Sequence, residues 1–188
     1  RRAGRVSGGW SAGMIFRTVQ PPEGCAPGAH HLEMVADPAA PFLEGNHVFM
    51  SIGAEQEGVS NPALRRATLS THISVDRVRE DGDARRGYVQ QVQDRMRRTV
   101  AELAPEWCEI VREFTGSART FKRWTGRSEG LVGGIPRRAG LAAYAGVLGE
   151  RFPEGFHLVG DSVFPGQSTL ATAIGGIKSA EAVMKQLA

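Results

Sequence analysis

The sequence has few cysteines, no long uncharged run and no basic tract, and each shortage excludes a class of protein. Cys25 and Cys108 are the only cysteines and lie far apart, so a disulfide framework is excluded and both are expected to be reduced thiols. The longest stretch without a charged residue, 162–177, contains Gln, Ser, Thr and Pro. It falls short of the roughly 20 apolar residues that a membrane-spanning helix needs, so no span is predicted.

The basic and metal-binding residue types form no recognition motif. The net charge is +3 and 23 residues are Lys or Arg, but they are scattered along the chain. Aromatic residues do not alternate with them as in RNA-binding motifs, so we expect a solvated basic surface and no nucleic acid. His30 and His31 are the only adjacent histidines, and neighbouring strand residues point to opposite faces. No Cys or acidic cluster joins them at zinc spacing, so no metal is expected.

Hydrophobic periodicity predicts strands and a long helix in the middle of the chain. Residues 47–52 are a short apolar run, and residues 67–75 alternate polar and β-branched side chains as half-buried strands do. These two segments are expected to pair as antiparallel neighbours. Residues 85–104 have the spacing of an amphipathic helix that stops before Pro105. Its predicted apolar face consists of Val89, Val92, Met96, Val100 and Leu103.

The flanking regions give weaker signals. Residues 1–46 are rich in Gly, Ala and Pro, which favours loops with one or two strands. The apolar segment 107–114 fits either a strand or a helix. Residues 115–140, with their Gly-Gly-Ile-Pro turn, are predicted to be an ordered loop region, and 141–148 a short helix or buried coil.

The C-terminal region predicts a strand, a tight loop and a helix. Residues 156–159 are a short apolar run, and Ser168 or Thr169 can cap a helix that runs to about Leu187. A helix N-terminus stabilises an electron-rich or anionic group, because its first N–H groups are unpaired. Asp161 can accept hydrogen bonds from sugar or ribityl hydroxyls, and Gly160 lets the backbone approach a ligand. A solvated Asp at a plain strand–helix junction explains the same residues equally well.

The same segment admits a serine-esterase interpretation. Gly160-Asp161-Ser162 matches the Gly-Asp-Ser block of one family of serine esterases, in which Ser162 would be the nucleophile. That chemistry needs a general base, usually a histidine positioned by an acid. In that family the base lies far downstream, whereas no histidine here follows His157. The esterase interpretation is therefore disfavoured.

Three blocks of sequence resemble the phytoene-desaturase-like FAD oxidoreductases, which include carotenoid desaturases and isomerases. Residues 158–168, with the small-residue helix after them, resemble the C-terminal flavin motif of that family. Residues 117–134 are similar to the segment before that motif, and 48–75 to the strands of the substrate domain. The resemblance implies an α/β fold, mixed α+β, from the C-terminal part of a Rossmann-like FAD/NAD(P)-binding flavoprotein with an antiparallel-sheet substrate domain. Residues 1–130 would be a partial substrate-binding domain, and 131–188 would complete the FAD-binding domain.

This sequence differs from that family because it lacks the dinucleotide-binding loop. The family binds FAD through an N-terminal β-α-β unit with a G-x-G-x-x-G loop, which this sequence does not contain. Because the chain also starts at Arg1 and not at Met, we expect the C-terminal portion of a longer protein. Such a portion would need the N-terminal FAD-binding region as its partner.

FAD is the cofactor that the resemblance implies. In the family the C-terminal helix aims its N-terminus at the pyrimidine edge of the flavin, where negative charge develops on reduction. The resemblance therefore implies that the backbone amides of 169–171 face that edge and that Asp161 binds the ribityl hydroxyls. The implied cofactor-binding residues are Gly160, Asp161, Gln167, Ser168, Thr169, Leu170 and Ala171.

The implied activity is the FAD-dependent dehydrogenation of a polyene carotenoid precursor by hydride transfer to flavin. Two alternatives stay open: a carotenoid cis–trans isomerase that uses the same flavin, and a truncated fragment without catalysis or cofactor. Phe49, Trp124 and Phe164 are candidates to line a polyene tunnel, although plain core packing is the commoner role of such residues. No catalytic base is named, because the carboxylates that could serve can all be solvated: Glu102, Glu106, Glu109, Glu113 and Glu129.

A water-insoluble substrate implies a peripheral contact with a membrane surface. An apolar patch with basic flanks would make that contact, since no spanning helix is predicted. The expected location is the cytoplasm or a peripheral membrane site, of the plastid or thylakoid type in a photosynthetic organism.

Overall fold

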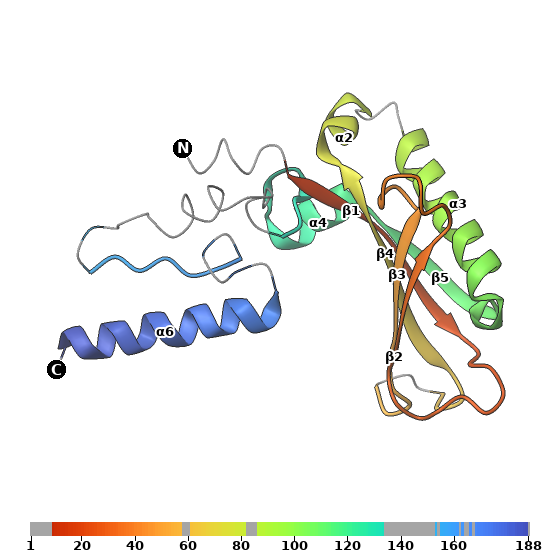
Figure 1. The fold of residues 1–188 in the computed structure, drawn as a ribbon, viewed down its shortest axis with the longest axis horizontal. Helices are drawn as coiled ribbons and strands as arrows, with labels where there is room; N and C mark the ends of the chain where they lie inside the picture. The colour runs from red at the N-terminus through yellow and green to blue at the C-terminus, as the bar shows by residue number, and fades with distance from the viewer. Residues whose placement is uncertain are drawn as a thin grey trace. The chain divides into compact units, whose positions relative to one another are not determined.

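The computed structural model describes residues 9–57, 61–81, 86–133, 153, 155–161, 163, 166 and 168–187. They fall into two units, Trp10–Leu131 and a second that includes the described part of 132–188 (Figure 1). The first unit is a mixed α+β fold on an antiparallel sheet. The expectation for 141–148, and those for Ser162, Phe164 and Gln167, lie outside the described residues.

Five strands form a single antiparallel sheet in the order β2-β3-β4-β1-β5. The predicted strands at 47–52 and 67–75 and their antiparallel pairing are confirmed, as are the strands expected within 1–46. The ambiguous segment 107–114 contributes a strand. The strands are β1 (Trp10–Val19), β2 (His30–Val35), β3 (His47–Ile52), β4 (Arg65–Ser74) and β5 (Ile110–Gly116).

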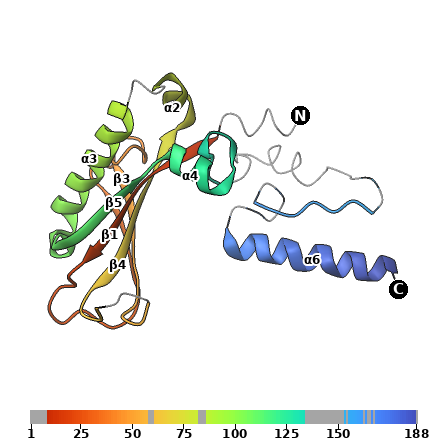
Figure 2. The same cartoon turned by 180° about the vertical axis from the view of Figure 1, so that it is seen from behind.

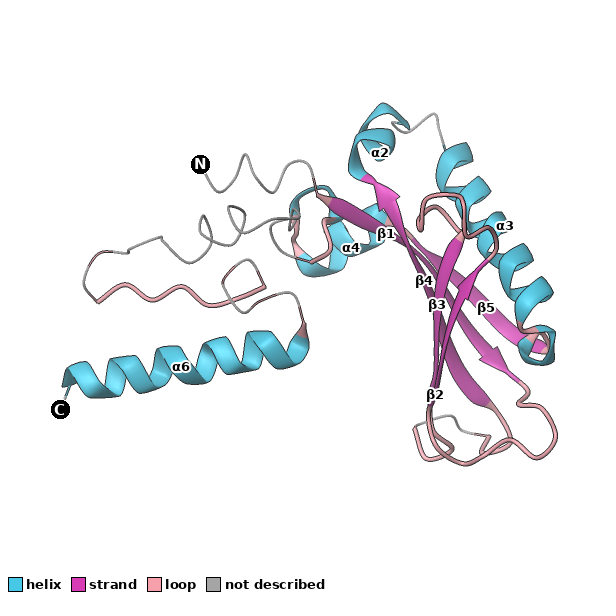
Figure 3. Cartoon of the chain, viewed as in Figure 1, coloured by secondary structure: helices cyan, strands magenta, loops and turns pink. Residues whose placement is uncertain are grey.

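One long helix covers one face of this sheet and forms the core with it. Helix α3 (Arg86–Leu103) runs along the sheet, which confirms the predicted helix and its end before Pro105 (Figures 1 and 3). Met96 and Val100 are fully buried against strand residues such as Ile15 and Leu69. Leu103 is the exception on the predicted apolar face, because it lies 49% exposed at the last helical position.

A short helix stands where an ordered loop was expected, so that part of the prediction is wrong. Helix α4 (Ala118–Thr125) begins after Ser117, whose N–H donates to Thr120 Oγ1 at 3.2 Å. It ends at Gly126, which adopts a left-handed conformation and donates its N–H to the Lys122 carbonyl at 3.1 Å. The glycine thus stops a helix. The other short elements within the described residues are α2 (Val75–Asp81), η1 (Pro105–Trp107) and η2 (Ser128–Gly130).

The described part of the second unit contains a long helix and an extended segment beside it. Helix α6 (Thr169–Leu187) confirms the predicted C-terminal helix. The predicted strand at 156–159 is wrong, because the described residues of this unit offer it no ladder partner and a strand requires one. Instead His157 Nε2 lies 3.3 Å from Gln186 Oε1 of the helix. Among the described residues, no helix is both long and apolar enough to cross a membrane.

Candidate functional site

Ser168 sets the beginning of helix α6. Its Oγ accepts a hydrogen bond from the Ala171 N–H at 3.0 Å, and its carbonyl accepts the first helical bond from Thr172 at 2.9 Å. Ser168 and not Thr169 is therefore the N-cap. The cap occupies the amide of Ala171, so Thr169 and Leu170 remain as the first-turn amides to consider for a ligand.

The loop before α6 depends on two glycines. Gly160 has φ +140°, and a Cβ added there would meet no atom within 4 Å. The space at Gly160 thus fits the close approach of a ligand. Gly166 has φ +26°, and a Cβ there would lie 2.4 Å from the Asp161 carbonyl oxygen. The loop therefore closes only with glycine at 166, a requirement that the Pro165-Gly166 pair signals and that the sequence-based site did not include.

A small cavity lies between the extended segment and α6. It measures about 170 Å³ and is lined by residues that include His157, Val159, Gly160, Gly175 and Lys178. Ligand pockets usually measure about 300–1,000 Å³. The described part of this unit therefore forms one wall of a small cavity and does not enclose a volume of that size. Asp161 is half-buried at the end of that wall.

The sheet face opposite α3 carries a strip of aromatic side chains, which we call the aromatic face: Trp10, Phe16, Phe49 and Phe114. All four are between 39% and 54% exposed. Phe16 pairs directly with Phe114 across β1 and β5, while Phe49 on β3 pairs with Ser70, which in turn pairs with Met14 of β1. This face presents exposed rings on three strands, with polar side chains among them. The Arg112 guanidinium lies 4.5 Å from the centroid of the Phe114 ring, and Glu33 of β2 pairs with Phe49.

Two histidines contact the rings of the aromatic face at different places, His72 level with Ala12 and His31 level with Phe16. His72 packs edge-on against Trp10, with 6.4 Å between ring centroids, and His31 stacks on Phe49 at 5.8 Å. Burial lowers the pKa of His72 below its ordinary value, and the nearby His47 lowers it further. His72 is therefore neutral at pH 7 and compatible with an apolar ligand.

Of the three residues predicted to line a substrate tunnel, the two that the structure describes lie on different elements. Phe49 lies on the aromatic face. Trp124 lies on α4 and is 77% exposed, so it belongs to neither the core nor the sheet surface. Phe164 is outside the described residues.

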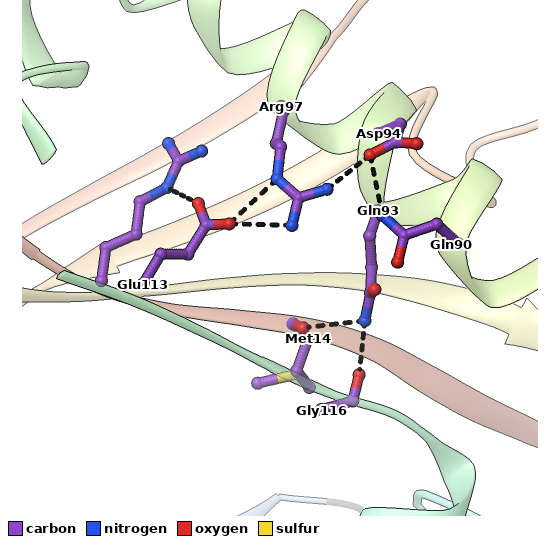
Figure 4. A network of polar contacts seen from close by, with 8 residues as sticks. Met14, Gln90, Gln93, Asp94, Arg97, Glu113 and Gly116 are labelled. Atoms are coloured by element: carbon purple, nitrogen blue, oxygen red, sulfur yellow. Dashed lines mark hydrogen bonds and ion pairs between the residues drawn. The ribbon is translucent and has the colours of Figure 1, made fainter. Parts of the chain in front are cut away.

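A buried polar network lies on the opposite, core face of the sheet (Figure 4). Arg17 Nε donates to Glu113 Oε2 at 2.8 Å, and Arg97 donates to Glu113 Oε1 at 2.8 and 2.9 Å. Arg97 also bonds Asp94, and Gln93 Nε2 donates to the Gly116 carbonyl at 3.0 Å. The network connects α3 to strands β1 and β5.

Glu113 is the acid on which this network converges. The carboxylates were described as residues that can all be solvated, but Glu113 is largely buried, since its side chain is 23% exposed and that of Arg17 only 2%. Burial would raise the pKa of Glu113, but hydrogen bonds from Arg97 and Arg17 and their positive charges outweigh burial and hold that pKa below its ordinary value. The geometry is that of a structural ion-pair cluster.

The His, Cys, Asp and Glu side chains that the structure describes form no metal centre. Within that part of the chain, no group of three or more His, Cys, Asp or Glu residues is placed to hold a metal ion. Cys25 and Cys108 are free and half-buried, and Cys25 Sγ lies 3.4 Å from His30 Nε2.

Comparison with known proteins finds similarity to carotenoid enzymes over part of the chain. No family model matches the chain. Over 82 residues, 42% of this chain, it is 34% identical to the chloroplastic prolycopene isomerases 1 and 2 of an Oncidium hybrid cultivar. Over 72 residues, 36% of the chain, it is 38% identical to the chloroplastic prolycopene isomerase of Arabidopsis thaliana. These matches cover 13% and 11% of the relatives' own lengths.

Proposed function

We propose that this chain is part of a flavin-dependent carotenoid enzyme that isomerises double bonds of a polyene. The similarity to prolycopene isomerases carries the proposal, because those relatives are isomerases by name. It favours isomerisation over the dehydrogenation that the resemblance to the desaturase-like family implied. Desaturation of the polyene is the second candidate, since the flavin motif is common to both activities. The relatives are chloroplastic, which supports a plastid location.

The C-terminal unit would hold one side of FAD. Gly160 would let the cofactor approach the backbone, Asp161 would accept hydrogen bonds from ribityl hydroxyls, and the amides of Thr169 and Leu170 would face its electron-rich edge. When bound, FAD supplies a centre that can take up and return electrons. The positive end of α6 would stabilise negative charge at that position.

The exposed apolar face of α6 supports a role in completing a Rossmann-like FAD domain. Leu170, Ile177 and Met184 are 72%, 60% and 62% exposed, and no described residue of α6 is buried. Apolar surface of this extent normally packs against another element. In the proposal, that element is the FAD-binding region that carries the dinucleotide loop.

The aromatic face would form one wall of the polyene site. A carotenoid is long, rigid and apolar, and the exposed rings of Phe16, Phe49 and Phe114 lie on one face of the sheet, on β1, β3 and β5. Burial of such rings against a polyene is favourable, at about 25 cal/mol per Å² removed from water. This assigns Phe49 a substrate contact and leaves Trp124 without one.

Product analysis tests the proposal. The full-length protein that contains this chain is incubated with FAD and a poly-cis carotenoid, the products are separated by chromatography, and their masses are measured by mass spectrometry. We expect a product of unchanged mass and altered double-bond geometry. A product lighter by a pair of hydrogens would identify a desaturase. Unchanged substrate together with no flavin binding would favour the non-catalytic interpretation.

Replacing Asp161 by Ala is expected to weaken flavin retention, because the ribityl hydroxyls would lose a charged acceptor. The measurement is the FAD content of the purified protein by absorbance, with Glu181→Ala on the exposed surface of α6 as the matched control. Equal FAD content in the Asp161→Ala variant and the unaltered protein would contradict the assignment of Asp161.

A further inference from the structure

The connection between β1 and β2 places a cysteine next to a histidine. Cys25 Sγ lies 3.4 Å from Nε2 of His30, the residue at which β2 begins. Figures 1 and 2 show this connection as a loop at the end of the sheet where β1 and α3 both end. There the His30 ring packs against Trp107 of η1, with 5.7 Å between ring centroids. The contact with Trp107 holds the imidazole beside the sulfur atom.

The hydrogen bonds of His30 place a proton next to that sulfur atom. His30 Nε2 also lies 3.2 Å from the Ala26 carbonyl oxygen, and a carbonyl oxygen only accepts hydrogen bonds. Nε2 therefore carries the ring proton, which faces both the carbonyl oxygen and Cys25 Sγ. A donor in this position stabilises a thiolate more than a neutral thiol, because the charged sulfur is the stronger acceptor.

A buried arginine lies close to the same thiol. Arg65 Nη2 donates to the Ala26 carbonyl oxygen at 3.5 Å, and the Cys25 thiol donates to that oxygen at 3.5 Å. The Arg65 side chain is only 5% exposed, whereas Glu55, its ion-pair partner at 3.8 Å, is 50% exposed. Water screens the exposed carboxylate more than the buried guanidinium, so Glu55 offsets only part of the positive charge. The remaining charge adds to the stabilisation of the thiolate.

The second cysteine of the chain provides a contrast. Cys25 and Cys108 are both half-buried, so the two thiols are similarly accessible. Cys108 Sγ donates to the Ala104 carbonyl oxygen at 3.8 Å, and no described histidine or arginine forms a hydrogen bond with it. The residues on both sides of Cys25, 23–24 and 26–29, are exposed, which opens the loop to reagents in solution. The two cysteines thus differ mainly in the charges and donors around the sulfur atom.

We propose that Cys25 is a site of reversible modification by small-molecule disulfides. Cys25 loses its proton to water, and the resulting thiolate attacks one sulfur atom of the disulfide. The sulfur–sulfur bond of the reagent breaks, a bond forms between Cys25 Sγ and the attacked sulfur, and the other sulfur leaves as a thiolate that takes a proton from water. Cys25 is thereby oxidised, and the departing half of the reagent is reduced to a thiol. This reaction needs neither flavin nor polyene, so it is independent of the proposed function.

Mass spectrometry of peptides tests the proposal on the full-length protein that contains this chain. The reduced protein is incubated with glutathione disulfide, samples are quenched with acid over time, and the modified fraction of each cysteine is measured. We expect Cys25 to react about tenfold or more faster than Cys108, and dithiothreitol to remove the adduct. In denaturing urea the two cysteines should react at similar rates. Equal rates in the folded protein, the same difference in urea, or an adduct that resists dithiothreitol would overturn the proposal.

Two adjacent histidines supply matched variants. His30→Gln removes the imidazole beside the thiol and should slow the reaction of Cys25 about tenfold, toward the rate of Cys108. His31→Gln replaces a histidine that stacks on Phe49 and should leave the rate at Cys25 unchanged. An undiminished rate in His30→Gln, or equal slowing in both variants, would overturn the proposal. The comparison of Cys25 with Cys108 needs no substitution, so it decides the question even if a variant fails to fold.

Discussion

Replacing Glu113 by Ala is expected to destabilise the sheet unit by about 3–5 kcal/mol. The change leaves the guanidinium of Arg17 buried without its counter-ion, and Arg17 Nη1 already has no hydrogen-bond partner. Arg97 loses its carboxylate as well, although its contact with Asp94 remains. Chemical denaturation of the unaltered and variant chains, followed by far-ultraviolet circular dichroism, measures the difference in free energy of unfolding.

Two comparisons separate the buried charge from a general loss of a carboxylate. Glu109→Ala removes an exposed carboxylate nearby and should change the free energy of unfolding by less than about 0.5 kcal/mol. Combining Glu113→Ala with Arg17→Met removes the unpaired charge and should restore much of the stability. A similar cost for Glu109→Ala and Glu113→Ala would contradict the role of the network.

The ion pairs of Glu113 with Arg17 and Arg97 also predict that the free energy of unfolding depends on pH. The pKa of Glu113 is lowered in the folded state, so its contribution is fully present above the ordinary value of 4.5. That contribution is lost as the pH falls through the lower folded pKa, because the protonated acid no longer pairs with Arg17 and Arg97. The unaltered chain should therefore lose more stability on acidification than the Glu113→Ala variant, measured by denaturation across that range.

Replacing Gly130 by Ala is expected to destabilise the unit by about 3 kcal/mol or more, because a Cβ there would lie 2.0 Å from the Ala118 carbonyl oxygen. The backbone of α4 would have to move away from η2 to make room. The buried bond from Ser11 to the Gly130 carbonyl would weaken at the same time. Thermal and chemical denaturation measure the loss.

Gly126 provides a matched control for this change. Its φ of +69° is close to the +64° of Gly130, but a Cβ at Gly126 would meet no atom within 4 Å. Gly126→Ala should therefore show only the left-handed backbone cost, about 1–2 kcal/mol. Equal losses in the two variants would mean that backbone conformation, and not the contact between α4 and η2, makes Gly130 necessary.

Local sequence patterns predicted the elements that are regular and amphipathic. Alternation at 67–75 and helical spacing at 85–104 identified strands and a helix that the structure contains. Helix α4 was missed because only eight residues separate its capping signals, and its many charges and flanking glycines are also typical of loops. The strand at 156–159 was predicted wrongly for a different reason. An apolar run indicates burial but does not supply the pairing partner that a strand needs.

The candidate site likewise contains some residues that the sequence revealed and others that only the structure revealed. Gly160, Asp161 and the capping serine were visible because they lie within a few residues of one another, next to a helix start. The aromatic face was not visible, because Phe16, Phe49 and Phe114 come from three strands that are brought together only by the strand order.

The amino-acid sequence alone thus determined the main strands, the two long helices and the cap at the start of α6, because these depend on spacing between near neighbours. Tertiary structure decided which residues meet across the sheet. Arg17 and Glu113 are 96 residues apart, and their pairing follows from β1 lying beside β5. A buried ion pair of this kind depends on strand order and register, which no local pattern encodes, since hydrophobic alternation sets only which face a residue occupies.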